Sequence, residues 1–388
     1  MFNHKAINTT LLKEKAFNHR WAMLPDGVIP LTAADLDFPC APEISEAICK
    51  FSADRYFSYG PAEGYTFFRE AVANFHSKKR NTFTKPEFVM AVNSAAYGIF
   101  MVCKAMLNKG EEAIVFNPVD FLFKHSVEAN NGVAVSFPVS LNPEDEVDTD
   151  LLEQLISNKT KLICLCNPLN PTGKVFKKKE LERIGQIAIK HNLMILSDEI
   201  WSDIVFKPNT YVSIASLPKP IKERVIIVTG YSKSYGLAGL RIGSVIAPNA
   251  ALYDTLMEAS GHQSTVQGCN VLAQVAVTAA LNECSYWLQN FVEHLTKMRD
   301  ICVEELNKIT GFSCAIPQGC YLAFPNIQQS GFTAEELQAF LLKQAKVAVV
   351  PGLSQWFGDR AAGHIRISFA TSEELLRDAL FRISKAIN

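Results

Sequence analysis

Short apolar runs alternate with helical patterns between about residues 85 and 250. Seven runs rich in valine, isoleucine and leucine have the length of strands, and they cover residues 88–92, 112–116, 133–137, 161–166, 193–197, 224–229 and 242–247. Segments 94–107 and 178–191 place apolar residues three and four positions apart, which is typical of helices. This alternation predicts an α/β fold with a mostly parallel seven-stranded sheet covered by helices.

The pattern changes after Pro248. The chain becomes mostly helical to about residue 310, and segment 285–309 is long enough to bridge two domains. Beyond Gly311, strands are expected at 321–327, 346–352 and 364–370, with helices at 333–345 and 372–387. This region predicts a second, smaller α/β domain.

The charges are balanced, with 38 Lys and Arg against 39 Asp and Glu, so the chain lacks the basic surface that binds nucleic acid. No apolar stretch is long enough to cross a membrane, and the first residues carry Lys, Glu and His where a secretory signal has an apolar core. The ten cysteines lack the spacing of zinc ligands, so no metal site is expected. These features predict a cytoplasmic globular protein with neither a nucleic-acid nor a membrane partner.

Polar turns follow several predicted strands, at the edge where an open α/β sheet collects its ligands. After strand 88–92, Ser94, Ala95 and Ala96 open a helix whose free N–H groups suit a phosphate, although Asn and Ser are also common helix caps. After strand 161–166, a turn with two prolines projects Asn170, whose amide both donates and accepts hydrogen bonds. A purely structural turn explains its prolines and glycine but not its two asparagines, Asn167 and Asn170.

Two further turns carry charged residues. Asp198 follows strand 193–197, where burying a carboxylate is costly unless it meets a positive partner such as a protonated ring nitrogen; an exposed strand end is the alternative. Lys233 lies among hydroxyls and glycines after strand 224–229, and Arg241 comes eight residues later. A single Lys is usually a solvated surface residue, but these surroundings favour a functional site.

Taken in order, these motifs resemble the class I and II aminotransferases of the pyridoxal 5′-phosphate (PLP)-dependent fold-type I superfamily; they are Asn170-Pro-Thr-Gly, Asp198 and Ser232-Lys233 with Arg241. Segments 34–38, 197–206 and 315–324, and Tyr59 with Gly64, are most similar to the cystathionine β-lyase-like C–S lyase branch. The resemblance covers nearly the whole chain. It implies a large PLP-binding domain over 46–285 and a small domain formed by 1–45 and 286–388.

The resemblance also implies chemical roles at the cofactor ring. Lys233 would hold PLP as a Schiff base and then move the proton of the substrate Cα. A lysine suits this task because desolvation can lower its pKa. Asp198 would keep the pyridine nitrogen protonated, so that the ring takes up electrons, and Asn170 would donate to the phenolic oxygen.

At the phosphate, the resemblance assigns Arg241, Ser232 and the N–H groups of Ser94 to Ala96. Tyr59 matches a tyrosine that reaches the phosphate of the neighbouring subunit, which implies a homodimer with shared active sites. The substrate α-carboxylate would be bound by Arg366, with Asn170 and the backbone at Ala34 beside it, unless Arg366 is an ordinary strand-end residue.

Three positions depart from the family pattern. Trp201 stands where aminotransferases usually carry Tyr and the lyases His, and an indole donates a hydrogen bond but cannot accept one. Gly230 stands where many aminotransferases have a phosphate-binding Ser. Asp120 replaces the expected ring-stacking aromatic, which leaves Phe121 as the candidate for that contact.

Transamination of a small amino acid is the leading hypothesis for the reaction. The alternative is β-elimination from cystathionine or a cysteine conjugate, giving pyruvate, ammonia and a thiol. Both reactions begin with loss of the same Cα proton, so the motifs that promote this step do not separate them. A non-catalytic regulatory protein on this fold is a further alternative, which the complete set of cofactor residues disfavours. A PLP-dependent oxidase or decarboxylase is another, which these residues leave open.

Overall fold

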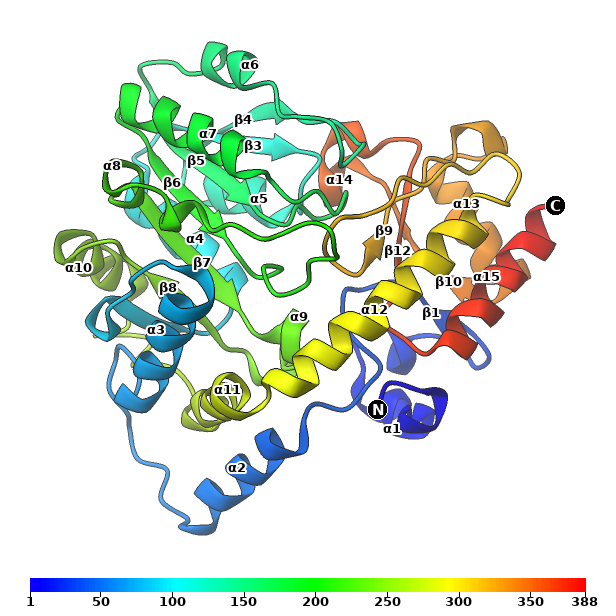
Figure 1. Cartoon of the computed structure of the whole chain (residues 1–388), viewed down its shortest axis with the longest axis horizontal. Coiled ribbons are helices and arrows are strands. Elements are labelled where there is room, and N and C mark those ends of the chain that lie inside the picture. Colours follow the sequence, from blue (N-terminus) through cyan, green and yellow to red (C-terminus); the bar gives the residue numbers. More distant parts are fainter.

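A seven-stranded sheet forms the centre of the molecule (Figure 1), in a computed structural model that describes all residues, 1–388. The strand order is β2-β8-β7-β6-β5-β3-β4. The strands are β2 (Val89–Val92), β3 (Glu112–Asn117), β4 (Val133–Pro138), β5 (Thr160–Cys166), β6 (Met194–Asp198), β7 (Val225–Gly230) and β8 (Gly243–Ile246). Each strand overlaps one of the seven apolar runs, so the predicted sheet is confirmed.

Six strands of this sheet point in one direction, and β8 runs antiparallel to both of its neighbours, β2 and β7. Every residue of β7 and all but one of β5 are buried, as expected for strands covered on both faces. Because Cys166 pairs with Asp198, β5 and β6 end at the same level. The turns that follow these strands therefore meet at one edge of the sheet.

Helices cover the sheet and connect its strands. In the region up to residue 283 they are α1 (Thr9–Lys15), α2 (Pro42–Ala53), α3 (Thr66–Arg80), α4 (Ala95–Met106), α5 (Leu122–Ala129), α6 (Thr149–Gln154), α7 (Lys178–Lys190), α8 (Lys219–Lys222), α9 (Ser232–Tyr235), α10 (Ala250–Ser260) and α11 (Val271–Glu283). Helix α4 packs against β6, β7 and β8, and α11 packs against α2 and α3. The helices predicted at 94–107 and 178–191 are confirmed as α4 and α7.

The C-terminal region forms a smaller α/β layer, beside which the N-terminal segment lies (Figure 1). Its helices are α12 (Ser285–Leu306), α13 (Ala334–Phe340), α14 (Ser354–Phe357) and α15 (Glu373–Ile387), and a π-helical turn, η7 (Leu341–Ala345), extends α13. Helix α12 runs from the large sheet to this layer (Figure 1). One cluster of 100 buried apolar residues extends through both parts, so the two layers share a continuous core.

Short strands complete the smaller layer, and here the prediction of one strand at 346–352 is wrong. Val347–Ala348 (β10) pairs in parallel with β1 (Ile29–Pro30), whereas Val350–Pro351 (β11) pairs antiparallel with β12 (Ile365–Ser368), which also pairs with β9 (Leu322–Ala323). One segment thus contributes to two sheets. Strand β1 has only two residues, too few for an alternating pattern to be recognised.

No helix is both long enough and apolar enough to cross a membrane.

Candidate active site

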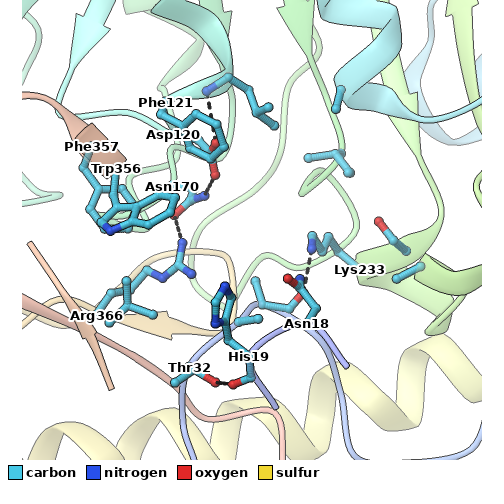
Figure 2. Close-up of a pocket in the computed structure, with 18 of the residues that line it drawn as sticks. Asn18, His19, Thr32, Asp120, Phe121, Asn170, Lys233, Trp356, Phe357 and Arg366 are labelled. Carbon is cyan, nitrogen blue, oxygen red and sulfur yellow. Dashed lines mark hydrogen bonds between the residues drawn. The ribbon is translucent and has the colours of Figure 1, made fainter. Parts of the chain in front are cut away.

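A cavity of about 660 Å³ opens where the turns of the large sheet face the smaller layer (Figure 2). Its wall contains all but one of the residues predicted from the sequence: Ala34, Ser94, Ala95, Ala96, Phe121, Asn170, Asp198, Trp201, Ser232, Lys233, Arg241 and Arg366. These residues come from at least seven separate segments of the chain. The missing one is Tyr59, which is 89% exposed and lies outside the cavity.

Lys233 projects into the cavity from the short helix α9, directly after β7. Its Nζ donates a hydrogen bond of 2.5 Å to the carbonyl oxygen of Ala34 and lies 5.6 Å from the centre of the Trp201 ring. Burial lowers the pKa of Lys233, and the nearby Asp35 opposes this shift. The amine is therefore closer to its neutral, nucleophilic form than a surface lysine is.

Asp198 ends β6 and is 5% exposed. One carboxylate oxygen accepts a hydrogen bond from the backbone N–H of Ile200 at 3.1 Å, and the Cys166 thiol lies 3.9 Å from the other. Burial raises the pKa of Asp198 to about 7, because the surrounding protein supplies no cation in contact with it. A carboxylate in this position suits a positively charged ring nitrogen.

The N-terminus of α4 lines one end of the cavity. The Ser94 hydroxyl accepts a hydrogen bond from the backbone N–H of Tyr97, which caps the helix, whereas the N–H groups of Ala95 and Ala96 donate to no main-chain acceptor. A Cβ at Gly243 would lie 2.8 Å from the Ala95 nitrogen, so glycine is needed for β8 to pass this close. Free amides at a helix N-terminus are a suitable seat for a phosphate.

Two further residues line this end of the cavity. Arg241 is exposed, and its guanidinium donates only to the carbonyl of Ala238, at 3.3 Å, so most of its donors are free. Ser232 is the first residue of α9 and also lines the cavity. Both positions are compatible with the phosphate contacts that the sequence predicts.

Arg366, Asn170 and Asp120 form a row of hydrogen bonds across the cavity wall (Figure 2). Arg366 Nη1 donates to Asn170 Oδ1 at 3.2 Å, and Asn170 Nδ2 donates to Asp120 Oδ2 at 3.0 Å. The Arg366 guanidinium also lies 5.0 Å above the Phe357 ring, and its Nε is buried without a partner. Arg366 therefore retains donors for a carboxylate.

The two aromatic residues about which the sequence was least decisive occupy different environments. Trp201 is 2% exposed and packs edge to face on Tyr321, with ring centres 4.7 Å apart. Phe121 precedes α5, is 39% exposed, and packs edge-on against Trp356 at 5.5 Å. Trp201 is thus buried beside Lys233, whereas Phe121 is partly exposed.

Sequence reasoning missed the buried support of the Ala34 turn. Arg20 and Asp37 form an ion pair of 2.5 Å in which both side chains are almost fully buried, and Trp21 Nε1 donates to the same carboxylate oxygen at 2.6 Å. Arg20 also donates to the carbonyl of Ala33 at 3.1 Å. These contacts fix the backbone whose carbonyl receives Lys233, and no local pattern around Arg20 indicates them.

Together, these residues fit PLP. The cavity offers a lysine for the aldehyde, a buried carboxylate lacking a cation for the ring nitrogen, and free helix amides for the phosphate.

Comparison with known proteins gives a consistent result. The sequence profile described as "Aminotransferase class I and II" matches residues 26–383. An aspartate aminotransferase of Pyrococcus abyssi is 32% identical, with 93% of this chain and 92% of that protein aligned. Two solved structures each superpose with a TM-score of 0.86. The aromatic aminotransferase of Pyrococcus horikoshii is 28% identical and covers 93% of this chain and 96% of its own. A PLP-bound structure from Clostridium difficile is 27% identical and covers 98% and 95%.

These relatives are aminotransferases, and none of them singles out the C–S lyase branch. The chain belongs to the class I and II aminotransferases, enzymes of fold type I whose cofactor is PLP and whose substrates are amino acids.

Proposed function

We propose that this aminotransferase transfers the amino group of a small amino acid to a keto acid and that Lys233 carries the proton between the reacting atoms. The observation that carries the proposal is the convergence of Lys233, Asp198, Asn170 and Arg366 on one cavity. Bound PLP supplies an aldehyde that accepts the amine and a ring that takes up the electron pair released at Cα. The steps below concern the residues of the chain.

Lys233 acts as the base at the substrate Cα and then as the acid at the cofactor carbon. Its lowered pKa favours the neutral amine that this task requires, and α9 places it directly after β7. The Ala34 carbonyl, 2.5 Å from Nζ, orients the amine in the absence of substrate. The Trp201 ring packs beside it and excludes water from that side.

Asp198 holds the proton of the ring nitrogen, since a cation there allows the buried carboxylate to ionise. Arg366 binds the α-carboxylate through the donors that Asn170 leaves free. Asn170 would donate the Nδ2 hydrogen that Asp120 does not receive to the phenolic oxygen of the cofactor. Ser94, Ala95, Ala96, Ser232 and Arg241 bind the phosphate through backbone amides, hydroxyls and a guanidinium. Phe121 supplies an aromatic contact at the rim.

We further propose that the chain works as a homodimer with a large domain over 46–285 and a small domain formed by 1–45 and 286–388. Tyr56, Phe57 and Tyr59 are 81%, 58% and 89% exposed and lie within four residues, which is an unusual concentration of uncovered aromatics. A second subunit that covers them would bring Tyr59 to the phosphate of the neighbouring site. We also propose a reducing, cytoplasmic location, supported by ten unpaired cysteines.

The test uses the purified protein loaded with PLP and a panel of L-amino acids, with either pyruvate or 2-oxoglutarate as acceptor. Acceptor-dependent formation of a new amino acid supports the proposal, whereas pyruvate and ammonia released from cystathionine without an acceptor would contradict it. Borohydride reduction and peptide mapping should find PLP attached to Lys233. Lys233→Ala should abolish this attachment and lower turnover by about 100- to 10,000-fold, whereas Lys219→Ala, which removes an 82%-exposed side chain, should change neither.

A further inference from the structure

Asp203 lies outside the cavity wall and joins two of the segments that carry the proposed site. One of its carboxylate oxygens contacts Nη2 of Arg80, and the other accepts a hydrogen bond of 2.7 Å from the Ser234 hydroxyl. Arg80 Nη2 also donates to Ser202 Oγ at 3.0 Å. None of these four residues lines the cavity, so the proposed reaction gives them no role.

This row of contacts is buried along its length. The side chains of Arg80 and Asp203 are 10% and 13% exposed, and Ser234 is 0% exposed. The Arg80 guanidinium also lies 4.8 Å from the centre of the Tyr211 ring. An apolar pair of similar volume would often stabilise a protein interior as well as a buried ion pair does, because burying two charges removes their hydration. What the ion pair adds is the fixed direction of its hydrogen bonds.

Asp203 belongs to the turn after β6 that also carries Asp198 and Trp201. Two hydrogen bonds hold this turn. The backbone N–H of Ile200 donates to the Asp198 carboxylate at 3.1 Å, and that of Ile204 donates to the Trp201 carbonyl at 2.9 Å. The carboxylate that faces the cavity and the carboxylate that contacts Ser234 are thus parts of one hydrogen-bonded turn.

Ser234 belongs to α9, whose four residues form a single helical turn. A helix this short has little stability of its own, so contacts with neighbouring segments decide where it lies. Lys233 and Ser234 are consecutive and therefore point about 100° apart around the helix axis. Lys233 lines the cavity, while Ser234 reaches Asp203. The bond between Ser234 and Asp203 therefore fastens the segment that carries Lys233 to the turn that carries Asp198.

The proposed reaction makes strict demands on the position of the Lys233 amine. Its stem has four carbons and rotates freely, yet Nζ has to reach two different carbon atoms in turn. A displacement of about 1 Å in such a group can lower a rate by about 100-fold. The only acceptor bonded to Nζ is the Ala34 carbonyl, which lies in the N-terminal segment. On the side of the large sheet, the base of the lysine is therefore located by α9.

We propose that Asp203, held by Arg80, is a positioning residue for the proton transfer: through Ser234 it sets where the Lys233 amine lies relative to Asp198. This inference rests on the proposed function, because it takes Lys233 to carry the proton. A carboxylate suits this role, since an ionised acceptor makes stronger hydrogen bonds than a neutral one and its two oxygens serve Arg80 and Ser234 separately.

Ser234→Ala tests the link alone, because it deletes the hydroxyl and leaves the Arg80–Asp203 pair in place. Ser372→Ala is the matched control, since Ser372 is also 0% exposed and its hydroxyl caps α15 outside the cavity. Both variants should lower the urea midpoint of unfolding by similar amounts, because each loses a buried hydrogen bond. In the PLP-loaded protein, only Ser234→Ala should lower kcat, by about 10- to 100-fold, with KM within about threefold of the wild type because Arg366 is untouched.

Two further readouts are independent of turnover. In the PLP-free protein, the backbone amides of α9 should exchange with deuterium about tenfold faster in Ser234→Ala than in the wild type, as measured by mass spectrometry of the peptide that contains them. PLP added to this protein should become attached to Lys233 about tenfold more slowly, as followed by absorbance. Ser372→Ala should match the wild type in both measurements.

A double-mutant cycle tests whether Asp203 acts through Ser234. The amide of Asp203→Asn has a single oxygen, so it cannot accept from Arg80 and Ser234 through separate oxygens. The variant that combines Asp203→Asn with Ser234→Ala should lose no more kcat than the worse single variant, because both changes interrupt the same link.

The outcomes separate the two proposals. If the wild type converts no amino acid, the proposed function fails, while deuterium exchange and PLP attachment still report whether Ser234 anchors α9. If the wild type is active but the kcat of Ser234→Ala stays within about twofold of that of Ser372→Ala, the contact only stabilises the fold and the inference is overturned. Losses of kcat that multiply in the double variant would also overturn it, because Asp203 would then act by another route.

Discussion

Replacing Asp198 with Asn should stabilise the protein freed of PLP while weakening its capacity to bind PLP. Burial raises the pKa of Asp198 from 3.8 to about 7, so the folded protein binds a proton that the unfolded chain has released. Ionising this carboxyl therefore opposes folding, and stability is lost as the pH rises from about 4 to about 7. Asparagine has a similar shape and no charge, so it avoids this loss.

The magnitude follows from the pKa difference. Each pKa unit corresponds to about 1.4 kcal/mol, so a rise from 3.8 to about 7 costs the folded protein about 4 kcal/mol at about pH 8. Between about pH 5 and about pH 8 the cost grows by about 2.5 kcal/mol. The advantage of Asp198→Asn over the wild type should increase by this amount across the same interval.

The assay is urea unfolding of both proteins after removal of PLP, at several pH values, with the difference in unfolding free energy plotted against pH. Asp254→Asn, which changes an exposed carboxylate without hydrogen bonds, serves as the control and should show a difference that varies little with pH. Addition of PLP should stabilise the wild type far more than Asp198→Asn. A difference that is flat between about pH 5 and about pH 8 would refute the argument that Asp198 is buried without a cation.

Three further predictions concern the support of the site. Gly243→Ala should destabilise the protein by about 1–3 kcal/mol and weaken PLP binding, because the new Cβ would lie 2.8 Å from backbone atoms. Gly239→Ala, whose new Cβ would have no atom within 4 Å, is the control, and equal losses of stability in both variants would contradict this reasoning. Asp203→Ala should lower the unfolding free energy by about 2–4 kcal/mol in thermal or urea unfolding, since it leaves the largely buried Arg80 guanidinium without its carboxylate. A loss below about 0.5 kcal/mol would show that water solvates the Arg80–Asp203 pair. Arg366→Lys should raise the KM for amino acids by about 10- to 100-fold with a smaller effect on kcat, because lysine cannot bind a carboxylate through two parallel hydrogen bonds. An unchanged KM would show that Arg366 does not bind the substrate carboxylate.

Much of the fold and the site could be predicted because the signals are local. Each strand of the large sheet coincides with a mostly apolar run, and Asp198 and Lys233 lie at or just after the ends of such runs. A polar residue at the end of a buried parallel strand necessarily lies at the ligand-binding edge, so its position along the chain already indicates its place in the fold.

Other features depend on which segments pack together. Arg366 and Asn170 are hydrogen-bonded although 196 residues separate them, and the bond exists only because the smaller layer docks against the large sheet. The surroundings of Asp120 arise in the same way, since its hydrogen-bond donor Asn170 comes from the turn after β5 and the nearby charge of Arg366 comes from β12. The single strand expected at 346–352 divides between two sheets for a related reason, namely that its two halves meet different partners.

The sequence by itself determined the sheet, the residues that fit PLP and the reaction family, because apolar runs and the polar turns after them are properties of short segments. Only the tertiary structure decided which side chains share the cavity and how burial changes the pKa of Asp198. These properties depend on the distances between distant segments and on the exclusion of water from between them, and neither is encoded in any single stretch of the chain.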